Sequence, residues 1–182
     1  AMGKWFLKRG EFSEASRYFR AAIERITKRN ANPYDGEPYY NLGRCLRHRL
    51  DETHGAGDAR GLFEEAYAAF YKATWNNAWR AASHHALAEM DSSRHEWEKA
   101  LEHLDVALRL NADNLRALNL KALVLRRLGR DAEARQVIRA TLRIDPLDAW
   151  ALYQVGKGRR CDLQTAIDVA LDIARAGFYD EA

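Results

Sequence analysis

The chain has 182 residues, of which 47% are hydrophobic and 30% charged, so it can form one domain or a short array of repeats with a buried core. Its formal net charge is only +3, which argues against nucleic-acid binding, because proteins of that class concentrate much more positive charge on one face. No stretch approaches the roughly 18 consecutive apolar residues of a transmembrane helix, so no membrane association is expected.

The two cysteines, Cys45 and Cys161, are far apart and have no metal-like neighbours. We interpret them as reduced thiols, which suits a cytoplasmic protein. The first residues, AMGKWFLKRG, lack the apolar core of a signal peptide. Because Ala1 precedes Met2, we expect the native N-terminus to lie outside this sequence.

The composition predicts an all-α protein. Only three prolines occur, and alanine, leucine, arginine and glutamate, which favour helices, dominate the spans between them. Residues 54–61, HGAGDARG, are expected to form a mobile loop. The helices expected in chain order are 4–9, 11–29, 37–50, 62–75, 78–91, 96–110, 114–128, 131–143, 147–157 and 163–176.

Small residues recur along these helices with a period of 34. The period predicts a repeat in which small side chains let neighbouring helices approach closely. A turn residue, an aromatic residue two positions on and an alanine three positions later also occur as Gly10, Phe12 and Ala15, and as Gly177, Tyr179 and Ala182. The series are Ala66, Ala100 and Ala134; Ala88, Ala122 and Gly156, with Gly43 in the preceding unit; Ala73, Ala107 and Thr141; and Ala78, Ala112 and Pro146.

The period and three motifs, YYNLG at 39–43, LGRDAEA at 128–134 and IDP at 144–146, resemble the tetratricopeptide repeat family. The resemblance implies a right-handed superhelical array of antiparallel helix pairs, an α-solenoid, spanning 1–182 as a single domain truncated at both ends. The implied repeat units are about 1–33, 34–77, 78–111 and 112–145, a half unit 146–161 and a partial unit 162–182.

A narrower resemblance rests on the segments NPYDGEPYYNLGRCL, FYKATWNNAWRAASHHALAEMD and LRLNADNLRALNLKALVLRRLGR. They are similar to the repeat region of large bacterial proteins that also carry a mutarotase-like domain of unknown function. The segment 51–61 departs from that pattern, because those relatives have a short turn there.

In tetratricopeptide arrays the first helix of each pair lines a concave groove, so the resemblance implies a set of groove residues. Arginine and aromatic side chains, which are common at binding hot spots, dominate the set, and an acidic or C-terminal peptide suits it. The matching lysine of a carboxylate clamp is absent, and the arginines could equally form a solvated surface. The implied residues are Tyr40, Asn41, Arg44, Arg47, His48, His85, Glu89, Arg116, Asn119, Arg126, Arg127, Trp150, Tyr153 and Lys157.

Neither a metal site nor a cofactor is expected. His85 and Glu89 share a helix face, but His84 points roughly 100° away and no third ligand is near in sequence. Instead, we expect His84 to pack between helices and His85 to face the groove.

Other motifs also favour packing over chemistry. Trp75, Trp79 and Trp97 at helical spacing are typical of packing between helices. The run 156–158, GKG, lacks the spacing of a phosphate loop and is expected to end a helix. No set of catalytic residues is evident, so we expect no enzyme activity.

The sequence therefore predicts a non-catalytic protein–protein interaction scaffold that binds a peptide, or another domain of the same polypeptide, in its concave groove. The alternative is an accessory helical module of a larger carbohydrate-active bacterial protein whose catalytic domain lies elsewhere. Because the ends lack polar capping units, we also expect end-to-end self-association of the fragment.

Overall fold

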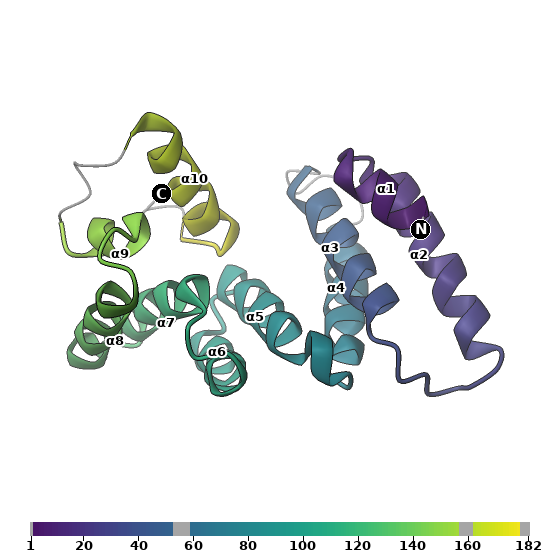
Figure 1. Cartoon of the computed structure of the whole chain (residues 1–182), viewed down its shortest axis with the longest axis horizontal. Coiled ribbons are helices and arrows are strands. Elements are labelled where there is room, and N and C mark those ends of the chain that lie inside the picture. The colour runs from purple at the N-terminus through teal and green to yellow at the C-terminus, as the bar shows by residue number, and fades with distance from the viewer. Residues whose placement is uncertain (1, 53–58, 157–161, 179–182) are drawn as a thin grey trace. The chain divides into compact units, whose positions relative to one another are not determined.

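The computed structural model describes residues 2–52, 59–156 and 162–178. Throughout these residues it contains helices and no strand, which confirms the all-α prediction (Figure 1). The chain divides into two compact units, Ala1–Ser83 and His84–Ala182. The division falls within one helix, α5 (Asn77–Ser93).

The first unit contains four further helices that pack in sequence order. These are α1 (Met2–Lys8), α2 (Phe12–Thr27), α3 (Glu37–Glu52) and α4 (Ala59–Ala73). Each packs on the next, and large apolar side chains such as Leu46 and Phe70 are buried between them. Arg20 of α2 also forms a two-bond ion pair with Glu65 of α4, with N–O distances of 2.7 and 2.6 Å.

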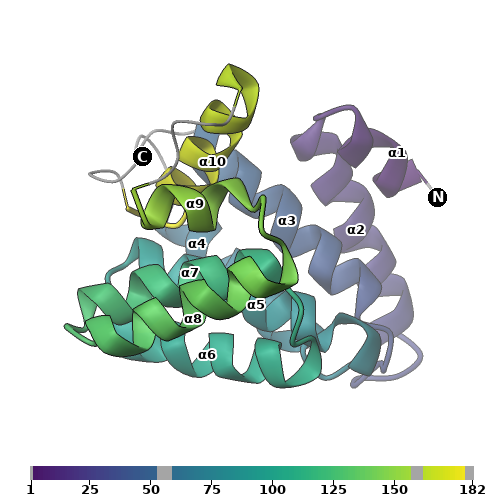
Figure 2. The same cartoon turned by 60° about the vertical axis from the view of Figure 1, so that its left-hand side comes forward.

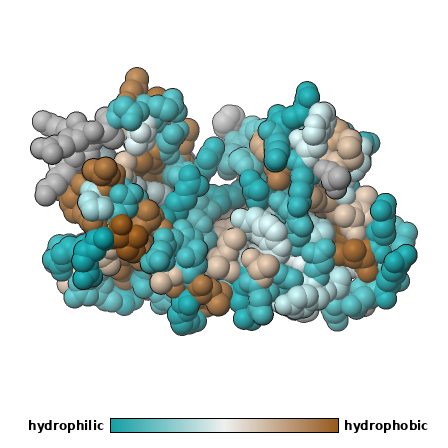
Figure 3. All heavy atoms as spheres, viewed as in Figure 1, coloured by the Kyte–Doolittle hydropathy of each residue, from teal (hydrophilic) through white to brown (hydrophobic). Residues whose placement is uncertain are grey.

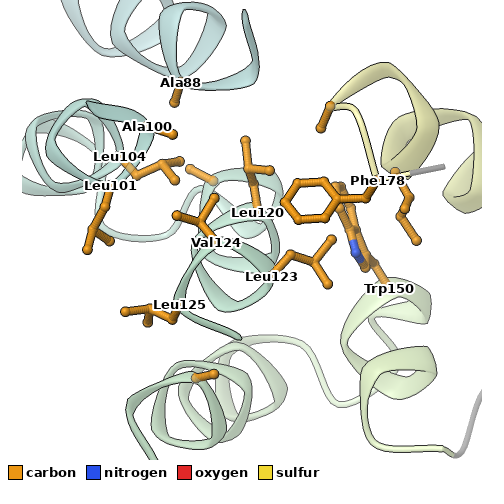
Figure 4. Close-up of a cluster of buried hydrophobic side chains, with 14 residues drawn as sticks. Ala88, Ala100, Leu101, Leu104, Leu120, Leu123, Val124, Leu125, Trp150 and Phe178 are labelled. Carbon is orange, nitrogen blue, oxygen red and sulfur yellow. The ribbon is translucent and has the colours of Figure 1, made fainter. Parts of the chain in front are cut away.

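The second unit begins in α5 and continues with α6 (Trp97–Leu110), α7 (Leu115–Arg127), α8 (Asp131–Ile144), α9 (Ala149–Gln154) and α10 (Leu163–Arg175). Helix α7 packs on both α6 and α8, and α9 contacts both α8 and α10. The main core lies around α7, whose Leu120, Leu123 and Val124 are almost fully buried (Figure 4).

The residues that begin three of these helices explain their start points. Asn114, Asp148 and Asp162 each accept a hydrogen bond from the backbone N–H three residues on, at 3.2, 2.7 and 3.0 Å. Such N-caps satisfy a backbone donor that has no partner inside the helix. The caps place the starts of α7, α9 and α10.

Most of the periodic small residues lie inside the helix pairs. Ala15, Ala66, Ala100 and Ala134 are fully buried. A side chain larger than a methyl group has no room at these positions, and this explains the period of 34. Two other series are also buried. One consists of Ala73, Ala107 and Thr141, and the other includes Ala88 and Ala122.

The packing expectation is wrong for the remaining small residues. Ala78, Ala112 and Pro146 are exposed, because they lie at or before the starts of helices and face solvent. Gly156 is also exposed; its φ of +72° turns the chain just after α9, which confirms that this glycine ends a helix.

Two predicted boundaries were also wrong. The helix expected over 147–157 is shorter, because Asp148 caps its start and Gly156 follows its end. The segment 54–61, expected as a loop, is helical from residue 59, since α4 starts at Ala59. The other residues of that segment, 54–58, lie outside the described part of the chain.

Candidate functional site

Two of the predicted groove residues on α7 fasten α9 in place. Asn119 is 1% exposed; its Nδ2 donates to Asp148 Oδ1 at 2.8 Å, and its Oδ1 accepts from Gln154 Nε2 at 3.3 Å. Arg126 Nη2 donates to the backbone carbonyl of Gln154 at 2.7 Å. Asn119 is therefore buried and not open to a groove, whereas Arg126 is half-buried and its place in the groove stays a prediction.

The side chain of Trp150, another predicted groove residue, lies in the core. It is 7% exposed and belongs to the same buried cluster as Leu120, Leu123 and Phe178 (Figure 4). A large aromatic ring gains most free energy when it is removed from water, and α7 offers it an apolar surface. Trp150 is therefore buried and not open to solvent, in the same cluster as Ile173 and Phe178 of the segment that follows it.

The helix α10 covers the side of α7 and α9 that was predicted to bind a partner. In both cartoon views α10 lies against α9 (Figures 1 and 2), and Asp172 of α10 forms an ion pair with Arg116 of α7, with N–O 3.2 Å. Ile173 of α10 belongs to the same buried cluster as Leu120 and Leu123. The predicted groove face of this unit thus contacts a helix of its own chain.

Phe178, three residues after the end of α10, is the deepest anchor of this segment. Its ring is fully buried, with its centroid 5.1 Å from that of Trp97, and the guanidinium of Arg127 lies 5.4 Å from the ring centroid. Burying a phenylalanine or isoleucine side chain stabilises a structure by about 1.5–3 kcal/mol. Phe178 and Ile173 together therefore account for most of the attachment of this segment.

Gly177 allows Phe178 to reach this position. Its φ is +86°, and a Cβ added there would lie 2.6 Å from the Cα of Ser93 at the end of α5. The Phe178 N–H donates back to the carbonyl of Ile173 at 3.2 Å, which closes the helix end. Only glycine combines this left-handed backbone with such close contact to another backbone.

The helix α10 carries a second apolar row that faces solvent. Leu163 is 77% exposed, Ile167 43% and Leu171 47%, and the spacing of four places them on one side of the helix. Figure 3 shows apolar side chains at the surface in the region of α10. This helix is therefore apolar on two faces, and only one of them is buried.

An open cavity of about 210 Å³ lies between α7, α9 and α10. Arg116 and three aspartates, Asp148, Asp168 and Asp172, line it together with the apolar Trp150 and Val169. Within it Asn119 donates to Asp148, and Arg116 forms an ion pair with Asp172.

In the first unit the predicted groove residues lie on α3, and most take part in packing. Asn41 is buried and donates to the carbonyl of Glu37 at 3.0 Å, so it is not an open contact residue. Tyr40 stacks on Trp79 with ring centroids 4.8 Å apart. Arg44 is exposed and Arg47 half-buried.

His48, the remaining predicted residue of α3, stacks on Phe12 with centroids 4.2 Å apart and ring planes 7° from parallel. On α5, His85 and Glu89 are half-buried. Tyr153, at the end of α9, is about half exposed. Lys157 lies outside the described residues.

The packing expected for the tryptophans is found at two of three positions. Trp79 stacks on Tyr40, and Trp97 contacts Phe178. Trp75 is half exposed, and the ammonium of Lys72 lies 3.6 Å from its ring centroid. A cation above an exposed indole face is a favourable surface contact.

A histidine pair at the interface of α5 and α6 was only half predicted. His84 Nδ1 lies 2.9 Å from His103 Nδ1, and His103 Nε2 lies 3.6 Å from Oδ2 of the buried Asp91. Burial lowers the pKa of His103 below its ordinary value of 6.5. His84 was expected in this interface, but its partner, 19 residues away, has no local sequence signal.

Among the described residues, no group of three histidine, cysteine, aspartate or glutamate side chains is arranged to hold a metal ion. None of the described helices is both long and apolar enough to cross a membrane.

A comparison with known families gives one match within the second unit. Residues 84–149 match the model of the tetratricopeptide repeat family. The matched residues comprise most of α5, then α6 to α8 and the start of α9. A comparison with curated proteins gave no match.

Solved structures extend the similarity in fold to nearly the whole chain. One crystal structure of MamA is 18% identical in sequence, with a TM-score of 0.62, and the match covers 97% of this chain and 94% of the MamA chain. Another is 19% identical, with a TM-score of 0.60 and coverages of 99% and 92%. The MamA RS-1 ArsTM double mutant is 17% identical, with a TM-score of 0.64 and coverage of 96% and 90%. At such low identity these structures show the fold alone, that of a tetratricopeptide-type α-solenoid.

Proposed function

We propose that this protein is a non-catalytic scaffold that binds a peptide or another protein domain on the first helices of its repeats. The observation that carries the proposal is that the predicted binding face of α7 and α9 holds a helix, α10, through buried apolar side chains and the Arg116–Asp172 ion pair. A face that accommodates one amphipathic helix has the chemistry to accommodate others.

Rigid support of the face favours this role. Asn119 and Arg126 tie α9 to α7 through buried or half-buried hydrogen bonds, so the surface is formed before any partner arrives. A pre-organised surface loses little conformational freedom on binding, which improves affinity. On the first unit, Arg44 of α3 offers an exposed guanidinium of the kind that binds carboxylates in two places.

The proposal can be tested by comparing arginines on first and second helices. The double variant Arg44→Glu/Arg116→Glu reverses two exposed charges on α3 and α7. The control, Arg25→Glu/Arg135→Glu, makes the same change on the exposed faces of α2 and α8. Each protein is immobilised, partners are identified by mass spectrometry, and each partner is then purified and titrated against the wild type.

We expect the wild type and the control to retain the same purified partner, and the first-helix variant to lose it. Equal affinity of the partner for all three proteins would place binding away from these faces. Circular dichroism of both variants checks that the helices remain folded.

Three finer predictions belong to the same proposal. A cytoplasmic location, a place within a larger bacterial protein and end-to-end association of the fragment each follow from the sequence patterns and remain predictions.

A further inference from the structure

The segment that covers α7 and α9 is attached mainly through residues 169–178. Ile173, Ala176 and Phe178 are buried in the core cluster with Val169 against it, and the Asp172–Arg116 ion pair and the Arg127–Phe178 contact join the segment to α7. The Arg116 side chain is 71% exposed, so water competes for this ion pair. The first half of α10 adds exposed apolar residues and an open cavity, and little close packing.

We propose that the face of α7 and α9 is a docking site for an amphipathic helix of a partner protein, and that residues 163–178 cover this site until the partner displaces them. The inference rests on the proposed scaffold function and names its partner class.

The face itself does not depend on α10. The bonds that fix α9 on α7 join Asn119 to Asp148 and Gln154, and Arg126 to Gln154, and none involves residues 163–178. When α10 leaves, this hydrogen-bonded framework remains. The departure uncovers a ready-made apolar surface that includes Leu120, Leu123 and Trp150.

The two apolar faces of α10 also favour its displacement by a partner helix. A helix with a single permanent place normally presents one apolar stripe to the core and polar residues to solvent. Helix α10 instead leaves Leu163, Ile167 and Leu171 exposed while Ile173 is buried. The exposed row Leu163, Ile167 and Leu171 adds nothing to the attachment of α10, so detachment costs only the burial of its other face.

The contacts of residues 172–178 define the chemistry of the partner. Asp172 faces Arg116, Ile173 enters the core, Gly177 touches the backbone of Ser93 and Phe178 packs on Trp97. A competing helix needs an aspartate followed by an aliphatic residue, three further residues, then a glycine and an aromatic residue. A basic residue in the aspartate position would be repelled by Arg116.

Gly177 gives a selective way to open the site. In Gly177→Ala the new methyl group would meet the Ser93 backbone, so residues 163–178 must detach or shift. The matched control is Gly129→Ala, whose φ of +72° imposes the same backbone strain but whose Cβ meets nothing within 4 Å. Phe178→Ala, which removes the main anchor, is a second opening variant if Gly177→Ala does not fold.

The probe is a fluorescent peptide with the sequence of residues 163–178, titrated by anisotropy against the full-length proteins. Apparent affinity scales with the fraction of molecules whose site is open. We expect the peptide to bind Gly177→Ala or Phe178→Ala at least roughly tenfold more tightly than it binds the wild type or Gly129→Ala. Adding Arg116→Glu to the opened protein should weaken binding, and a peptide carrying Asp172→Arg should restore it.

Two results would overturn the inference: equal binding of the peptide to the opened and closed proteins, or failure of the charge exchange to restore affinity. A wild-type dimer that the peptide converts to monomer would assign the site to a second copy of the chain instead. Loss of peptide binding leaves the partner capture with Arg44→Glu/Arg116→Glu unaffected, so the two proposals can fail separately.

Discussion

At the scale of single residues, burial decides which side chains can react. Cys45 lies at 0% exposure in α3, and removal of its thiol from water raises its pKa to about 11, although Arg44, Arg20 and Arg49 partly oppose the shift. The thiolate is the reactive form of cysteine, and it is scarce when the pKa lies far above the ambient pH.

Cys45 is therefore expected to resist thiol reagents in the folded protein. The measurement uses Cys161→Ser, in which Cys45 is the only cysteine, and follows labelling by Ellman's reagent at pH 8 with and without urea. We expect labelling to be at least roughly tenfold slower than in urea, because both the protonated state and the packing protect the sulfur. Fast labelling without urea would show that the first unit opens readily.

His103 makes stability depend on pH. Its pKa is lowered by burial in the folded protein, whereas the unfolded chain has the ordinary value near 6.5. Between these two pKa values the unfolded state binds more protons than the folded state. The contribution of neutral His103 to the free energy of unfolding is therefore complete above about pH 6.5 and is lost as the pH falls. Glu102 opposes the shift, and Asp91 and His84 also face this ring.

We expect the free energy of unfolding, measured with urea, to fall between pH 7.5 and pH 5.5 in the wild type. His103→Gln keeps a hydrogen-bonding group beside His84 but cannot titrate, so it should flatten this dependence. His95→Gln, at an exposed histidine in the turn after α5, serves as the control and should retain the wild-type slope. Identical slopes in all three proteins would remove His103 from the explanation.

At the scale of helices, neighbouring helices can approach closely where one of them carries glycine, which has no Cβ. A Cβ added to Gly43 of α3 would lie 2.8 Å from two ring atoms of Phe70 in α4. Phe70 is 1% exposed, so its ring has little space into which it can move.

Gly43→Ala is accordingly expected to destabilise the protein by about 1–3 kcal/mol, the usual cost of an overpacked core. This outweighs the gain of about 0.5–1 kcal/mol when alanine replaces glycine inside a helix. Urea unfolding gives the value. In a double-mutant cycle Phe70→Leu, which removes the clashing ring, should make the Gly43→Ala substitution nearly neutral or favourable; additive costs would contradict the assigned contact.

The helices themselves were predictable because their signals are local. Alanine-rich spans and the glycine turns lie next to the residues they organise. The groove residues were harder, because register along α7 says which side a residue faces but not what covers it. That α10 returns to α7 depends on Asp172, Gly177 and Phe178 meeting residues more than 50 positions away, and a periodic pattern carries no such information.

At the scale of the whole molecule, the chain combines two compact units whose surfaces differ. The first presents Arg44 of α3 to solvent, whereas the second covers the equivalent face of α7 with its own helix. In repeat proteins each repeat contacts mainly its neighbours, so a surface on one unit can change without rebuilding the other. The scaffold proposed here therefore has one face that is accessible and one that requires displacement.

The shortness of α9 makes this helix dependent on its neighbours. This helix has only six residues, and isolated helices shorter than about 12–15 residues are marginal in water. Its conformation therefore depends on the bonds that Asn119 and Arg126 extend from α7. Formation of α9 is therefore expected to require α7, and Trp150 of α9 also packs with Ile173 and Phe178 in one buried cluster. Loss of either bond from α7 should loosen α9 and the segment 163–178 together.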